Sequence, residues 1–317
     1  MYKEILHIND LITYIKNEKN ISLTSSEEKR LKQLLQTHNY LNVLSLKYLF
    51  ASGTIKKYNS NNIYRIGYNY KITINYKELE KQYLKLLKLE KKLREAVLMY
   101  ETELKSHFIF FLQDFFQIHK INFNIFLNSL TFYDHKSQVI KPISKDFVET
   151  IISEWEKNTK DFSLRKLNSF TDYHLLIKIL TFGTIGKLLD CDYEGKKVFY
   201  LYNKYLQRYN IFSIGKKMQD LRAVTILRNS LCHKESLIIF LEKGIKKNKV
   251  LKKQNKKITE DYLQSRINAV SKIYEYYYLR LGKKKKLKND SWIKDYRKYR
   301  LSNGENGIKF KKIKIDV

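Results

Sequence analysis

The chain has 317 residues, with 62 Lys and Arg against 32 Asp and Glu, and therefore a formal net charge of +30. Hydrophobic residues make up 43% of the chain, which is enough to bury a sizeable core. Its two cysteines, Cys191 and Cys232, exclude a disulfide framework and a cysteine-rich zinc site.

The excess of positive charge favours a polyanionic partner, and nucleic acid is the commonest one. The chain is also rich in Lys, Asn, Ile and Tyr, the residues that AT-rich codons encode, so codon bias is a competing explanation of the lysines. Codon bias does not explain why the acidic residues failed to rise alongside. We therefore expect binding to nucleic acid, although basicity alone does not separate RNA from DNA or from a membrane surface.

Two observations bear on the cellular compartment. The first twenty residues contain no uninterrupted apolar stretch like that of a signal peptide. The longest apolar cluster, residues 108–112, is too short to cross a bilayer. We expect a cytoplasmic protein with no membrane partner.

One proline and ten glycines predict a chain dominated by long helices. In chain order, residues 26–50 read as helix, broken by the polar stretch 37–39. Strict alternation of apolar and other residues from Tyr64 to Ile74 predicts a half-buried strand or hairpin. From residue 76 to about 116, apolar residues at spacings of three or four predict one long helix. Further helices are predicted over 144–157, 170–190, 196–208, 217–241 and 258–281.

These patterns predict a mainly α protein in three parts. Residues 1–75 form an N-terminal helical region with a β-hairpin. Residues 76–245 form a helical domain, and residues 246–317 form a basic C-terminal helix and tail.

The stretch DLRAVTILRNSLCHKE, residues 220–235, carries the candidate chemistry. Within it, Arg228, Asn229 and His233 form the pattern R-N-x-x-x-H. On a helix, Leu221, Val224, Leu227 and Leu231 form one apolar stripe, whereas Asn229 and His233 share another face with Arg222. Arg228 lies near the edge of the leucine stripe, so its guanidinium has to reach round the helix. The competing interpretation is structural, because a lone helical His is usually a surface or core residue.

Three segments in order resemble the AbiD/AbiF-type abortive-infection proteins, whose HEPN domain is similar to those of type VI CRISPR effector nucleases. LEKKLREAVLMYETELKSH (89–107) resembles D-x-x-L-R followed by an I-E-x-x-L-(R/K) helix, with Glu90 in place of the usual Asp. LTFGTIGKLL (180–189) resembles T-F-G-x-L-S-x-L, with Gly186 in place of Ser. LRNSLCHKE (227–235) resembles L-R-N-x-(C/A)-A-H-H, with Lys234 in place of the second His. The match covers roughly residues 80–240.

The resemblance implies a HEPN-type helical bundle and a metal-independent endoribonuclease with no cofactor. The ribose 2′-OH then attacks the adjacent phosphate, which yields a 2′,3′-cyclic phosphate and a 5′-OH. His233 suits proton transfer, because an unperturbed imidazole has a pKa of about 6.5. Arg228 suits the phosphate, because its charge is permanent. Asn229 suits orientation of His233 or of a phosphate oxygen, and a two-fold homodimer supplies a second set of these groups.

Other residues have auxiliary roles in this interpretation. Glu101 borders the buried stripe of the long helix, where it can bond Arg228 or hold His233, and Arg222 shares the face of His233. RNA-binding residues are predicted in the C-terminal part, where cations mix with aromatic residues: Lys283, Lys284, Lys285, Lys286 and Tyr296. No metal site is predicted, because the seven histidines are scattered.

The leading functional interpretation is a toxin-like endoribonuclease of antiphage defence, restrained by a structured RNA or another antitoxin. One alternative is a non-catalytic RNA-binding HEPN protein whose Arg and His only grip phosphate. A third is a module that modifies or senses nucleotides.

Overall fold

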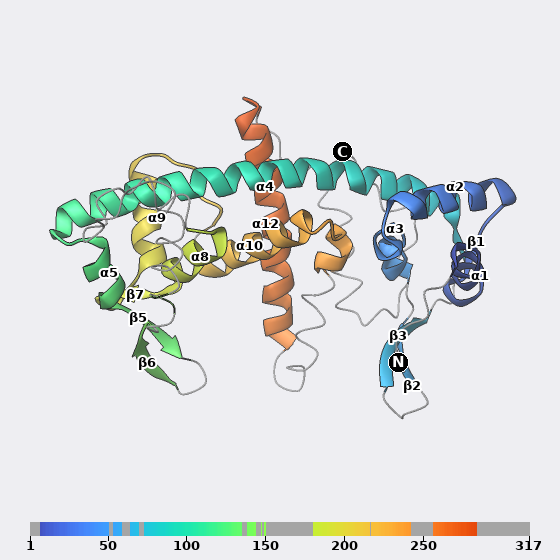
Figure 1. Ribbon diagram of the computed structural model, residues 1–317, viewed down its shortest axis with the longest axis horizontal. Coiled ribbons are helices and arrows are strands. Elements are labelled where there is room, and N and C mark those ends of the chain that lie inside the picture. The colour runs from blue at the N-terminus through green and yellow to red at the C-terminus, as the bar shows by residue number, and fades with distance from the viewer. Residues whose placement is uncertain are drawn as a thin grey trace. The chain divides into compact units, whose positions relative to one another are not determined.

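The computed structural model describes residues 7–50, 53–58, 64–69, 73–134, 138–143, 147, 149, 180–215, 217–241 and 256–283. These residues are mainly helical with a few short strands, which confirms the prediction of a mainly α protein (Figure 1). The chain forms two compact units: a first unit of residues 1–94 with 229–317, and a second unit of residues 95–228. The three-part division at residues 75 and 245 stays a prediction.

The helix α4 (Tyr76–His119) is 44 residues long and confirms the long helix predicted from residue 76 onward (Figure 1). No glycine or proline interrupts it, and its buried residues recur every three or four positions, as in Leu86, Leu89 and Leu93. The helix ends at Lys120, which has the left-handed φ of 53°, and the Ile121 N–H donates to the Phe116 carbonyl at 3.2 Å.

The first unit takes the beginning of α4, the end of α10 (Met218–Cys232) and the helical residues 237–241. Its helix α2 starts with a capping box, in which Thr24 accepts from the Glu27 N–H and Glu27 accepts from the Thr24 N–H. Its other elements are α1 (Ile8–Lys19), β1 (Ile21–Ser22), α2 (Ser25–Thr37), α3 (Tyr40–Val43), η1 (Ser45–Phe50), β2 (Gly53–Tyr58), β3 (Tyr64–Asn69), β4 (Ile74–Asn75) and α12 (Lys256–Arg280).

The predicted hairpin in this unit is formed by β2 and β3, which pair antiparallel from Gly53 opposite Asn69 to Tyr58 opposite Tyr64 (Figure 1). The alternating stretch therefore supplies only the second strand of the hairpin. The last residue of the stretch, Ile74, begins β4, which pairs in parallel with β1 and places the buried Ile21 opposite Ile74.

In its described residues, the second unit combines the rest of α4 with the helices α5, α8 and α9, most of α10, and a four-stranded antiparallel sheet in the order β6-β5-β7-β8. The sequence pattern did not predict this sheet, because its strands are short. The elements are α5 (Phe123–Ser129), β5 (Leu130–Asp134), β6 (Val139–Pro142), α8 (Phe182–Asp190), β7 (Asp192–Tyr193), β8 (Lys196–Lys197) and α9 (Val198–Arg208).

Aromatic rings form the core of the second unit. Phe111 lies 5.9 Å from Phe108, 5.6 Å from Phe115 and 5.5 Å from Tyr202, measured between ring centroids. Edge-to-face and tilted ring pairs at these distances stabilise a core beyond the area that they bury. The exposed His119 stacks on Phe115 with 4.1 Å between ring centroids.

The helices predicted over 26–50, 196–208 and 258–281 are present, and the first is broken near residue 38 as expected. Two predicted helices are wrong in extent. In the described part of the helix predicted over 170–190, residues 180–181 are not helical, and the Thr181 side chain caps the start of α8. The helix over 217–241 is two helices separated by a turn at 233–236. The helix predicted over 144–157 and residues 170–179 lie outside the described part, except for the helical residues 147 and 149.

Replacing Phe111 with Ala is expected to lower the free energy of unfolding by about 3–5 kcal/mol, because it removes a ring from the aromatic core. The neighbouring Phe110 is 50% exposed, against 3% for Phe111, so Phe110→Ala is the matched control and is expected to change stability by less than about 1 kcal/mol. Urea denaturation of both variants checks this, and equal losses would contradict the core assignment.

Candidate functional site

The predicted catalytic motif lies at the end of α10, where the two units meet in the sequence. Arg228 is the last residue of the second unit, whereas Asn229 and His233 belong to the first. Each part of the motif therefore has surroundings of its own.

In the second unit, Arg228 is half-buried and its Nε donates to the Glu101 Oε2 at 2.7 Å. Lys105 Nζ lies 3.4 Å from the other oxygen of the same carboxylate. Glu101 thus sits between two cations, and only 10% of its side chain is exposed. One of the two contacts expected for Glu101, the bond to Arg228, is present. The guanidinium reaches this partner from the edge of the leucine stripe.

Arg222 has a separate partner in the same unit. Its guanidinium pairs with the Asp190 carboxylate at the end of α8, and its side chain is 55% exposed. Ile226, one turn further along α10, is an exposed apolar residue at 42%. Arg222 and Ile226 are four residues apart, so the outward face of this part of α10 mixes a cation with an apolar side chain.

In the first unit, Asn229 and His233 are both exposed. His233 follows the last helical residue, and its N–H still donates to the Asn229 carbonyl at 3.0 Å. The Lys234 N–H donates to the Leu231 carbonyl and the Glu235 N–H donates to the Ser230 carbonyl at 2.8 Å. With Lys234 at a left-handed φ of 54°, these bonds form a Schellman motif that ends the helix. His233 therefore stands at the helix terminus rather than within a longer helix.

Two α4 residues of the E-x-x-L-R segment reach the turn that carries His233. The Leu237 N–H donates to the Glu90 Oε1 at 2.6 Å, and the Arg94 Nε donates to the Leu231 carbonyl at 2.9 Å. Burial raises the pKa of the Glu90 carboxyl to about 7, while its hydrogen bonds and Arg94 act to lower it. The family resemblance includes these two positions but assigns them no role. Asn42 and Ser45 also contact the turn, and no sequence pattern predicted these contacts.

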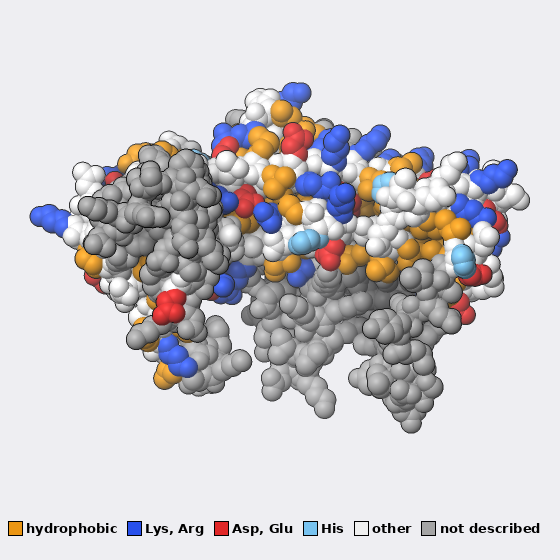
Figure 2. Space-filling view, in the orientation of Figure 1, with side chains coloured by type: hydrophobic (Ala, Val, Ile, Leu, Met, Phe, Trp, Pro, Cys, Tyr) orange, Lys and Arg blue, Asp and Glu red, His pale blue; other side chains and the backbone are white. Residues whose placement is uncertain are grey.

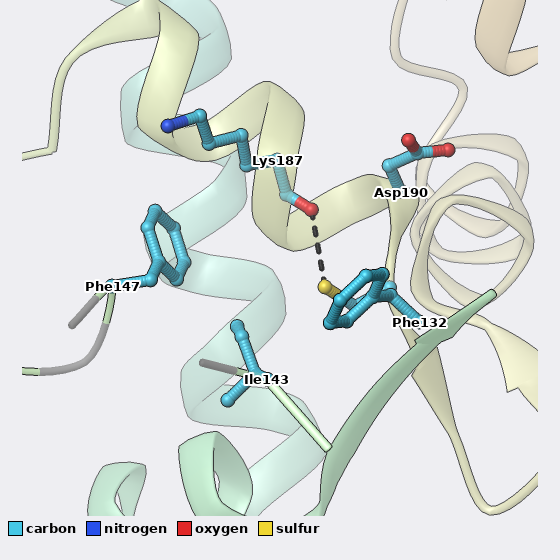
Figure 3. Close-up of a pocket in the computed structure, with 6 residues that line it drawn as sticks. Phe132, Ile143, Phe147, Lys187 and Asp190 are labelled. Carbon is cyan, nitrogen blue, oxygen red and sulfur yellow. Dashed lines mark hydrogen bonds between the residues drawn. The ribbon is translucent and has the colours of Figure 1, made fainter. Parts of the chain in front are cut away.

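A pocket of about 260 Å³ lies in the second unit between Phe132, Ile143, Phe147 and helix α8 (Figure 3). The Lys187 Nζ lies over the Phe147 ring, 5.1 Å from its centroid, and the Lys187 carbonyl accepts from the Cys191 thiol (Figure 3). Burial raises the pKa of Cys191 to about 11, so the thiol stays protonated and is no nucleophile at neutral pH. No predicted catalytic residue lines this pocket.

The remaining predicted site residues follow α12 in the sequence. Lys283 is exposed, and Lys284, Lys285, Lys286 and Tyr296 lie outside the described residues. Among the described residues, no three His, Cys, Asp or Glu side chains are placed together to hold a metal ion. In that same part of the chain, no helix is both long enough and apolar enough to cross a bilayer.

The pair Arg228 and Glu101 is expected to show a coupling energy of about 1 kcal/mol or more, because both charges are partly withdrawn from water. A double-mutant cycle with Arg228→Ala and Glu101→Ala, followed by urea denaturation, measures it. The exposed pair Lys272 and Glu275, with side chains 43% and 36% exposed, is the control and is expected to couple by less than about 0.5 kcal/mol. Equal coupling in the two cycles would contradict a specific role for Glu101.

Comparison of the chain with protein-family models, with curated proteins and with solved structures finds no match. The architecture is a mainly helical chain with a small sheet, and any activity has to be inferred from the residues of this chain.

Proposed function

We propose that this protein is a metal-independent endoribonuclease of the HEPN class, in which Arg228, Asn229 and His233 from two copies of the chain form the active site. The observation that carries the proposal is the exposure of Asn229 and His233 at the end of the helix that also holds Arg228. An exposed imidazole beside an exposed amide suits chemistry on a bound partner better than a role in packing. The ion pair of Arg228 with Glu101 supports it, since a carboxylate holds the guanidinium in one orientation.

The proposed reaction needs one proton acceptor and one proton donor. A neutral His233 takes the proton from the ribose 2′-OH as the 2′-oxygen bonds to phosphorus, and the bond from phosphorus to the 5′-oxygen breaks. A protonated His233 of the second copy gives its proton to the leaving 5′-oxygen. Arg228 carries the positive charge that the pentavalent phosphorus centre requires. The products are a 2′,3′-cyclic phosphate and a 5′-OH.

The distribution of charge supports an RNA substrate. Lys77, Lys81, Lys88 and Lys91 are exposed on the first-unit part of α4, and their spacing places them within an arc of about 80°. On the face shown in Figure 2, basic side chains outnumber acidic ones along this helix. Such a lysine ridge matches a phosphate backbone, which attracts cations whatever its base sequence. We propose a toxin-like enzyme of antiphage defence that a structured RNA or another antitoxin restrains.

Replacing His233 with Ala is expected to lower cleavage of an RNA oligonucleotide by roughly 10²- to 10⁴-fold, because proton transfer is lost. His7→Ala is the matched control, since His7 is also an exposed histidine of the first unit. Denaturing gels that resolve the cyclic phosphate product, with the deoxy oligonucleotide run alongside, measure the effect. Cleavage of the deoxy strand, or equal activity of both variants, would exclude the mechanism. A wild-type protein that binds RNA without cutting it would favour the non-catalytic alternative.

Reversing two charges of the lysine ridge, with Lys81→Glu and Lys88→Glu together, is expected to weaken RNA binding by about tenfold or more. The slope of log Kd against log salt is expected to fall by about 2. The double variant Lys196→Glu with Lys204→Glu changes the net charge equally, on exposed lysines of the second unit. Fluorescence anisotropy at several salt concentrations compares the two. Equal losses would mean that net charge, and not the ridge, governs binding.

A further inference from the structure

The turn that carries His233 lies between two helix ends. Residues 218–232 form α10, and a new helical segment starts at Leu237. Ser236 caps this second segment, because its hydroxyl accepts from the Ile238 N–H at 3.3 Å and its carbonyl accepts from the Phe240 N–H at 3.0 Å. The four residues 233–236 therefore have to satisfy the carbonyl groups of one helix end and the N–H groups of the next.

Glu90 and Arg94 bind the backbone on both sides of this turn. Arg94 donates to the Leu231 carbonyl, at the end of α10, and Glu90 accepts from the Leu237 N–H, at the start of the next helix. The two side chains are four residues apart on α4 and lie on the same face of it. The spacing E-x-x-L-R thus has a physical consequence: one carboxylate and one cation, a helical turn apart, match one N–H and one carbonyl.

Asn42 holds the middle of the same turn from a different element. Its amide donates to the Lys234 carbonyl, and its oxygen accepts from the Ser236 N–H at 3.2 Å. The hydroxyls of Ser45 and Ser236, both fully buried, lie 2.8 Å apart. These contacts hold the backbone after His233, and Arg94 holds it before His233 at Leu231, while the His233 side chain stays exposed.

We propose that Glu90 and Arg94 are positioning residues, which clamp the backbone of the turn so that the exposed His233 side chain is presented in one orientation. This inference rests on the proposed function for its consequence in catalysis, but the clamp itself is a property of the first unit. Glu90 and Arg94 do not touch the substrate. They act on His233 only through the turn.

The clamp has a pH dependence that follows from the burial of Glu90, which is 5% exposed. The charged or polar groups that interact with this carboxyl include Arg94 and Tyr83 on α4 and Ser236 on the turn. Burial raises the pKa of Glu90 from its usual 4.5 to about 7 in the closed clamp. The closed state therefore binds its proton more tightly than an open, hydrated state does. Stability of the clamp is full below pH 4.5 and is lost as the pH rises through 7.

Amide hydrogen exchange of the protein alone tests the clamp without any substrate. In Glu90→Ala, the Leu237 N–H loses its acceptor, so exchange at residues 234–238 is expected to accelerate by about tenfold or more, with the buried part of α12 unchanged. Glu95→Ala, one turn away at an exposed position, is the matched control and is expected to exchange like the wild type. Unchanged exchange at the turn, or an equal acceleration throughout the first unit, would overturn the proposal.

Glu90→Gln separates the charge from the contact. The amide oxygen of Gln still accepts from the Leu237 N–H, but it has no proton to lose. In the wild type, after correction for base-catalysed exchange, protection of the turn is expected to fall by about tenfold or more between pH 5 and pH 8. In Glu90→Gln it is expected to stay level. A level profile in the wild type would overturn the assignment of Glu90 as the buried carboxyl that controls the clamp.

Ribonuclease kinetics then separate the two proposals. If both hold, Glu90→Ala and Arg94→Met lower kcat with little change in KM, and Glu90→Gln recovers most of the activity. A wild-type protein that cuts no RNA would exclude the proposed function, whereas the hydrogen-exchange test of the clamp would still stand. A normal kcat in Glu90→Ala, with the turn opened, would show that the clamp does not position His233.

Discussion

A helix that ends inside a protein leaves carbonyl groups that need partners, and the end of α10 is where the candidate chemistry of this chain lies. Its last carbonyls are satisfied by the Schellman turn and by the Arg94 guanidinium. The following helix begins with the Leu237 N–H, which donates to the buried Glu90 carboxylate at 2.6 Å. Because both partners come from one face of α4, the position of His233 depends on the long helix as much as on its own.

Burial of the Glu90 carboxyl costs electrostatic free energy, and this cost suggests that the residue has a role. A carboxyl that is almost fully buried would usually be replaced by an apolar residue unless its hydrogen bonds served a purpose. Glu90 keeps a raised pKa although a backbone N–H, a hydroxyl and Arg94 all favour its charged form. Desolvation is therefore the largest effect at this position. A neutral side chain of the same shape would pack equally well. What the carboxyl adds under the proposal is a titratable proton, and through it a dependence of the turn on pH.

In the second unit, the buried carboxylate Glu101 has cationic partners. Glu101 is also buried, at 7% exposure, but it is flanked by Arg228 and Lys105 and is thereby compensated. Arg228 and Arg222 each have a carboxylate partner, from α4 and from the end of α8. The cations of α10 are thus held in place by acids, whereas the lysines of the α4 ridge project into solvent. The first arrangement suits orientation of a single phosphate, and the second suits attraction of a long polyanion.

The sequence by itself determined the mainly helical class, the length of α4 and the face of α10 that is exposed, because these follow from local periodicity and the lack of helix breakers. It also located Glu101 near enough to Arg228 to pair with it. The tertiary structure alone decided that the helix over 217–241 ends at Cys232, since a Lys in the left-handed conformation is no recognisable stop signal. It also decided the four-stranded sheet and the contacts of Asn42 and Glu90 with the turn. The contacts with the turn join residues 192 positions apart, Asn42 and Lys234, and 147 positions apart, Glu90 and Leu237, and no local pattern encodes such pairings.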